Sequence, residues 1–205
     1  MRSTEDEFAV AGYLAIAAAI LILPSFVLGI ATEVAKHRAP ELSLILLIPY
    51  FVVTIAYTFA AIYAILKFRL LLNKRHDFHA IDGLITAIVI GVIAMTLYAM
   101  PLKFFGLTGA LDEPPLVFLA VIPIAVVGIV LGILGIIVGA RLLNLPAENT
   151  SYYRVYAWLS IAAGICFVTF FLSPLGGLID AASNIVLAML FLKPDSEDPQ
   201  QPEFV

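Results

Sequence analysis

Asp180 is the residue of this 205-residue chain that most suggests chemistry, because it is a lone acid inside a long apolar run. Asn184 follows one helical turn later and Ser183 lies beside it. An ionised Asp at the centre of a bilayer costs about 2.5–3.5 kcal/mol, so such residues often mark ion or proton paths. A structural role is the alternative, since a helix start just before Asp180 tolerates a carboxyl group. Asp180 and Asn184 are therefore a candidate ion or proton site.

Small residues form a second pattern, at spacings of 3, 4, 3 and 4 on one helical face. The residues of this seam are Ala125, Gly128, Gly132, Gly135 and Gly139. Lipid provides no hydrophobic drive for helix association, and small residues let two backbones approach closely. The seam predicts a close helix–helix contact, whose partner can be in this chain, in a second copy or in another protein.

Polar residues form two further stripes at helical spacing. They are Tyr50, Thr54 and Tyr57 in one apolar run, and Asp82, Thr86 and Thr96 in the next. Both stripes are expected to face the interior of a helical bundle. Hydrogen bonds between helices are the favoured interpretation, and a polar conduit is the alternative.

Motifs for catalysis and metal binding are missing from the sequence. There is no Gly-x-Ser-x-Gly elbow, no His-Glu-x-x-His and no phosphate-binding loop. His76 and His79, with Asp82 nearby, make only half of a metal site. The single cysteine, Cys166, excludes a disulfide within the chain. We therefore expect no catalytic residues, no metal and no cofactor, and a protein that is more plausibly not an enzyme.

The composition is that of a membrane protein, with 62% hydrophobic and 13% charged residues. Soluble domains are typically about 45–50% apolar and about 25% charged. Six apolar runs approach the roughly 20 residues that a membrane helix needs. These runs cover residues 8–32, 42–66, 81–100, 116–143, 152–172 and 174–192. The sequence thus predicts an all-α, polytopic bundle of about six transmembrane helices in one domain, residues 1–193, followed by a polar cytoplasmic tail, residues 194–205.

Two weaker signals concern the arrangement of these runs. Spans that start near Phe8, Ala80 and Tyr152 are 72 residues apart, which suggests three helical hairpins. The aromatic residues Tyr152, Tyr153, Tyr156 and Trp158 are expected to form a belt at the membrane interface.

The lysines and arginines predict the orientation, because cytoplasmic loops are enriched in them. With six spans, eight of the eleven fall on one side of the membrane and three on the other. The eight are Arg2, Lys67, Arg69, Lys74, Arg75, Arg141, Arg154 and Lys193; the three are Lys36, Arg38 and Lys103. We expect a multi-pass protein of the cell membrane with both termini in the cytoplasm.

The first functional hypothesis is a non-enzymatic structural or accessory subunit of a membrane assembly. The alternative is a small ion, proton or solute transporter or channel that uses Asp180 and Asn184. Membrane lipids and other membrane protein subunits, or further copies of the chain, are the expected partners. Nucleic acid is not, since no basic domain exists and the net charge is −4. A seam that faces a partner would favour the first hypothesis, and a water-filled path touching Asp180 the second.

Overall fold

The protein is an all-helical bundle. A computed structural model describes residues 2–110, 113–145, 151–169 and 172–192, and these contain six α-helices and no strand. The helices are α1 (Arg2–Arg38), α2 (Pro40–His76), α3 (Asp82–Leu107), α4 (Pro114–Leu142), α5 (Ser151–Val168) and α6 (Ser173–Leu192). The predicted helical bundle is therefore confirmed.

Several helix ends follow from local chemistry. α2 and α4 begin at Pro40 and Pro114, where the missing backbone N–H of proline costs nothing. α2 ends before Asp77, whose left-handed backbone (φ 47°) lets its N–H bond to the carbonyl oxygen of Leu72. α3 runs past the predicted span 81–100 and through Pro101. Pro101 has no backbone N–H to donate to the preceding turn, yet the helix continues to Leu107.

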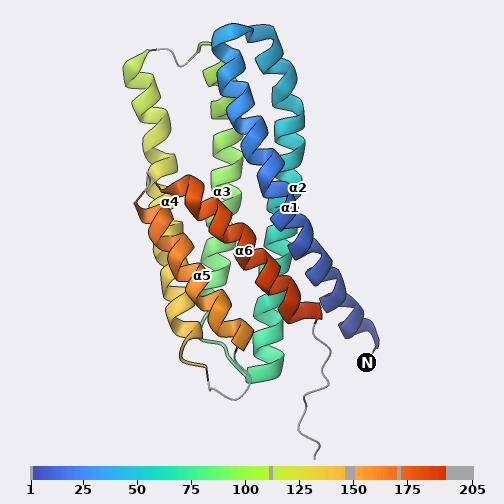
Figure 1. Ribbon diagram of the computed structural model, residues 1–205. Helices are drawn as coiled ribbons and strands as arrows, with labels where there is room; N and C mark the ends of the chain where they lie inside the picture. Colours follow the sequence, from blue (N-terminus) through green and yellow to red (C-terminus); the bar gives the residue numbers. More distant parts are fainter. Residues whose placement is uncertain (1, 111–112, 146–150, 170–171, 193–205) are drawn as a thin grey trace, which may run out of the picture.

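Contacts between the helices form a ring. Each helix packs against the next one along the chain, and α6 returns to pack against α1. Consecutive helices are antiparallel, so the chain forms three helical hairpins (Figure 1).

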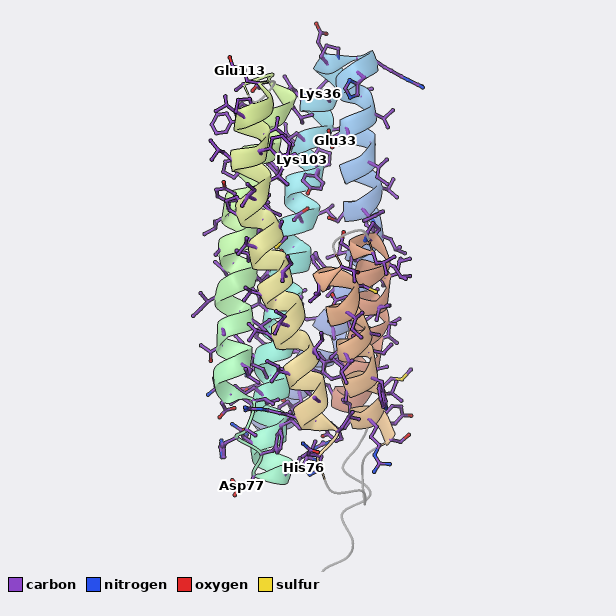
Figure 2. All side chains as sticks on the ribbon, turned by 90° about the vertical axis from the view of Figure 1, so that its left-hand side faces the viewer. Glu33, Lys36, His76, Asp77, Lys103 and Glu113 are labelled. Atoms are coloured by element: carbon purple, nitrogen blue, oxygen red, sulfur yellow. The ribbon has the colours of Figure 1, made fainter. Side chains whose placement is uncertain are left out.

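The last hairpin is much shorter than the first. α1 and α2 have 37 residues each, or about 55 Å, whereas α5 and α6 have 18 and 20, or about 27–30 Å. α5 and α6 therefore lie along one part of the bundle only (Figures 1 and 2). We call this part, where all six helices run side by side, the six-helix half. The remainder, built by α1–α4 alone, is the four-helix half.

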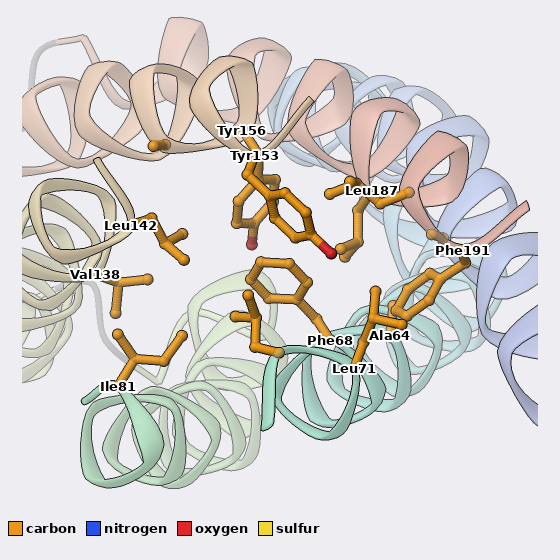
Figure 3. Packing of buried hydrophobic residues seen from close by; sticks show 14 of the residues in the cluster. Ala64, Phe68, Leu71, Ile81, Val138, Leu142, Tyr153, Tyr156, Leu187 and Phe191 are labelled. Carbon is orange, nitrogen blue, oxygen red and sulfur yellow. The ribbon is translucent and has the colours of Figure 1, made fainter. Parts of the chain in front are cut away.

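The main hydrophobic core fills the six-helix half. Phe68 of α2 is fully buried, and its ring centroid lies 4.8 Å from that of Tyr156 and 6.3 Å from that of Tyr153 (Figure 3). Leu187 and Phe191 of α6 complete the cluster. The interfacial belt predicted for the four aromatic residues is thus wrong for the two tyrosines, which point inward, while Tyr152 and Trp158 are exposed.

Large apolar side chains cover the outer faces of the helices. Ile48, Ile90 and Phe118 are among the most exposed. Five helices, all but α5, are long and apolar enough to cross a membrane. Charged residues gather at the two ends of the bundle, with Glu33, Lys36, Lys103 and Glu113 at one end and Asp77 at the other (Figure 2). This distribution is the one expected when lipid surrounds the middle of a bundle.

Candidate functional site

The Asp180 carboxyl group is held by residues of two helices. The hydroxyl of Tyr57 in α2 donates a 2.8 Å hydrogen bond to Asp180 Oδ2. The Asn184 amide nitrogen lies 3.3 Å from the same oxygen and 3.0 Å from the Asp180 carbonyl oxygen. The sequence had indicated Tyr57 and the Asp180–Asn184 pair separately. The structure joins them, although Tyr57 and Asp180 are 123 residues apart in the chain.

The depth of Asp180 differs from expectation. The structural alternative for Asp180 implies a position near an end of the bundle, because the residue closely follows the start of its helix. Its partner Tyr57, however, is near the middle of α2, 17 residues after Pro40 and 19 before His76. The short hairpin explains the difference. α6 begins alongside the middle of the long helices, as the contact of Gly177 with Ile22 of α1 shows.

A cavity of about 450 Å³ opens beside Asp180 and is lined by all six helices. Its hydroxyl-bearing lining includes Ser25, Tyr50, Thr54, Thr58, Thr96, Tyr156 and Ser160. Its remaining walls are mostly apolar and include Met95, Met100, Leu131, Ala163 and Phe167. Along α2 the lining extends from Tyr50 to Ile65, or about 22 Å at 1.5 Å per residue. The cavity is therefore elongated along the bundle axis.

An ionised Asp180 would have no counter-charge in the described lining of this cavity. Asp180 is its only acid, and no lysine, arginine or histidine occurs among the described residues that line it. Both hydrogen bonds to the carboxyl group end on Oδ2, and Oδ1 accepts none within the described part of the chain. Asp180 is half-buried rather than buried, because the cavity leaves part of it exposed. One carboxyl oxygen is thus available to a ligand.

The two ends of the cavity are different. Ile65, Ile88 and Val138 line its floor and belong to the core cluster or pack against it. At the opposite end, Lys103 of α3 lies over the ring of Tyr50, with 4.8 Å between its nitrogen and the ring centroid. Lys103 also reaches α1, at 3.0 Å from Glu33 Oε1 and 3.2 Å from the Gly29 carbonyl oxygen. Lys103 therefore links three helices at this end.

The glycines of the small-residue seam lie in two different environments. A Cβ atom on Gly132 would lie 2.7 Å from the Gly164 carbonyl oxygen of α5, and one on Gly139 would lie 2.5 Å from the Ala157 carbonyl oxygen. These glycines allow close contact between α4 and α5. Gly128 and Gly135 instead line the cavity, and a Cβ on Gly128 would meet nothing within 4 Å. The close contact made by Gly132 and Gly139 is thus inside the chain, whereas Ala125, the first residue of the seam, is half-buried.

The polar cluster around Asp82 holds helices together. Arg69 Nε and Asn73 Nδ2 donate to the carboxylate at 2.8 and 3.1–3.2 Å, and His79 Nδ1 lies 3.0 Å from it. This hydrogen bond raises the pKa of His79 above its ordinary value, because the carboxylate stabilises the imidazolium ion. His76 instead packs edge-on against Tyr153. The two histidines therefore do not converge, and no group of three metal-binding side chains occurs among the described residues.

Sequence reasoning missed the contribution of α5 to the cavity. Tyr156, Ser160 and Ala163 face it together with Gly164 and Phe167. Their spacing of three to four residues defines one helical face, and this signal was available in the sequence.

No family model, no curated protein and no solved structure matches this chain significantly. A function has to be argued from the geometry of the cavity.

Proposed function

We propose that this chain is a multi-pass membrane protein that carries a small solute or ion through the cavity at Asp180. The observation that carries the proposal is a lone carboxyl group midway along the bundle, which lines a cavity and has one oxygen without a hydrogen bond from the described residues. Acidic residues at such depth are costly and are usually tied to a transport path.

The dimensions of the cavity support transport. Its lining along α2 covers about 22 Å. The hydrocarbon core of a bilayer is about 30 Å thick, so the cavity would cover much of that distance. Hydroxyl groups from Thr54, Thr58 and Ser160 offer hydrogen bonds along the way. A plug of core residues closes one end, as in a protein that opens to one side of the membrane at a time.

The subunit hypothesis loses one of its supports. A seam that faces a partner would have favoured it, but Gly132 and Gly139 are occupied by α5 of the same chain. Assembly with other subunits or with a second copy stays a proposal, and is the outcome indicated if the transport experiment fails.

The orientation is proposed from charge. Lys67, Arg69, Lys74 and Arg75 lie towards the end of α2, next to the six-helix half. Because positive residues are enriched in cytoplasmic loops, this end would face the cytoplasm of a cell-membrane protein. The cavity would then be directed to the outer side.

Flux through purified protein in liposomes tests the proposal. Proton flux is followed with an internal pH dye, and uptake of sodium and tetraethylammonium with labelled ions. We expect the wild type to move at least one of these, and Asp180→Asn to lose that movement while staying folded, because an amide keeps the shape but not the charge. Asp77→Asn is the matched control, since Asp77 is 96% exposed at the end of α2. Equal flux in empty liposomes, wild type and Asp180→Asn would refute transport through this site.

A further inference from the structure

The further inference rests on the proposed transport function and concerns the chemical class of the molecule that the cavity binds. We infer that the Asp180 cavity binds a small organic cation, with its positive group at Asp180 and its apolar body against the surrounding walls. The inference rests on the charge, the volume and the lining of the cavity.

The charge of the site favours a cation. Asp180 Oδ2 receives the Tyr57 hydroxyl and the Asn184 amide, while Oδ1 is left for a ligand. No basic side chain of the described lining can neutralise an ionised Asp180. An anion would be repelled there, and a neutral solute would leave the carboxylate without a counter-charge.

The size and chemistry of the walls favour an organic ligand. A volume of about 450 Å³ is within the range of about 300–1,000 Å³ typical of small-molecule sites, and is far larger than one ion needs. Tyr57, Tyr156 and Phe167 contribute aromatic rings. Aromatic faces attract ammonium groups through their quadrupole, and they also bury apolar ligand surface.

The donor set does not suit a desolvated metal ion. Calcium takes 6–8 oxygen ligands and magnesium needs near-octahedral coordination. Here one carboxyl group is present, and its neighbours are engaged, since the Ser183 hydroxyl bonds to the Ile179 carbonyl oxygen and the Asn184 amide to Asp180. No other acid and no histidine occurs among the described residues that line the cavity, and no group of three such side chains occurs in the described chain.

Binding to the purified full chain in detergent tests the inference. The probe is benzyltrimethylammonium, whose charge does not depend on pH, and the readout is isothermal titration calorimetry. Benzyl alcohol is the neutral comparison, and sodium and magnesium chloride are the inorganic ones. We expect saturable binding of the organic cation, at least tenfold weaker binding to Asp180→Asn, and unchanged binding to Asp77→Asn.

A second variant tests binding in the cavity independently, in case Asp180→Asn does not fold. Gly128 lines the cavity and has open space at its Cβ position. Gly128→Leu should therefore fill the cavity and weaken binding without touching Asp180. Equal binding of the cation to the wild type, Asp180→Asn and Gly128→Leu would overturn the inference, as would equal affinity for benzyl alcohol.

The failure of this inference is distinguishable from failure of transport. Asp180-dependent flux of protons or sodium, together with no binding of benzyltrimethylammonium, would leave the proposed function standing and reject the organic ligand. Asp180-dependent binding of the cation without any flux would support the ligand and reject transport.

Discussion

The two halves of the bundle contain the same kinds of residue but pack them differently. In the six-helix half, aromatic and aliphatic side chains of α2, α5 and α6 meet in a core around the fully buried Phe68. Next to this core the helices leave the cavity, which begins beside Asp180 and Tyr156 in the six-helix half and extends along α2 to Tyr50. Tyr50 therefore lines a cavity, whereas Phe68 fills a core.

The comparison shows that the length of the α5–α6 hairpin determines where Asp180 lies along the bundle. α5 ends at Val168, at the level of Gly132 in α4, and α6 begins at Ser173. A hairpin as long as α1–α2 would carry Asp180 towards the end of the bundle. The short hairpin brings it to Tyr57 at the middle of α2. We therefore expect substitutions in the core around Phe68 to change stability, and substitutions around the cavity to change function.

Removing Phe68 should have the largest effect on stability. Phe68→Ala deletes a ring that is 0% exposed and contacts Tyr153 and Tyr156. Such core truncations cost about 3–5 kcal/mol. The free energy of unfolding in mixed detergent–SDS micelles measures this loss. Phe59→Ala is the matched control on the same helix, because Phe59 is 66% exposed and should cost little. Similar losses for both would mean that the core does not dominate.

Substitutions in the small-residue seam should have a smaller effect on stability, and this effect should differ between Gly139 and Gly128. Gly139→Ala places a Cβ 2.5 Å from the Ala157 carbonyl oxygen, so α4 and α5 must separate. Overpacking of this kind costs about 1–3 kcal/mol. Gly128→Ala should be neutral, since nothing lies within 4 Å. Thermal unfolding in detergent compares the two variants, and equal midpoints would show that the contact of α4 with α5 is not tight.

The elements of the bundle could be predicted from the sequence because each depends on local patterns. Apolar runs, Pro40 at a helix start and the seam spacing all act within a few turns. The length of α5 could not be predicted in this way. Its apolar run continues to Leu172, whereas the helix ends at Val168.

The site itself was predictable in part. Asp180 is evident as a lone acid in an apolar run, and Tyr57 as a member of a polar stripe. Their hydrogen bond joins helices far apart in the chain, and a single sequence contains no information on that pairing. The cavity could not be predicted either, because it depends on the space that six packed helices leave between them.

The contacts of Lys103 should affect the access of solutes to the cavity more than the stability of the folded protein. Lys103 joins Glu33 of α1 to Tyr50 of α2 above the cavity. Glu33 is largely exposed, so the ion pair is worth at most about 1 kcal/mol. Glu33→Gln should leave the unfolding midpoint nearly unchanged. It should speed the labelling of Thr54→Cys, in a Cys166→Ala background, by a water-soluble thiol reagent, because Lys103 is then held less firmly. An unchanged labelling rate would show that Lys103 does not restrict access.

The smallest expected effect is a pH dependence at the opposite end of the bundle. The carboxylate of Asp82 raises the pKa of His79 in the folded protein above its unfolded value of about 6.5. The stabilisation from this ion pair is therefore complete below about pH 6.5, and it is lost as the pH rises through the raised pKa. His79 is exposed, which keeps the effect small. The difference in thermal midpoint between the wild type and His79→Gln should be largest near pH 5.5 and vanish at high pH. Asp82→Asn should reduce this pH dependence and leave the smaller part that comes from Asp77, whose Oδ1 lies 3.2 Å from His79 Nε2. A constant difference between the wild type and His79→Gln across the pH range would show that His79 acts by packing rather than by charge.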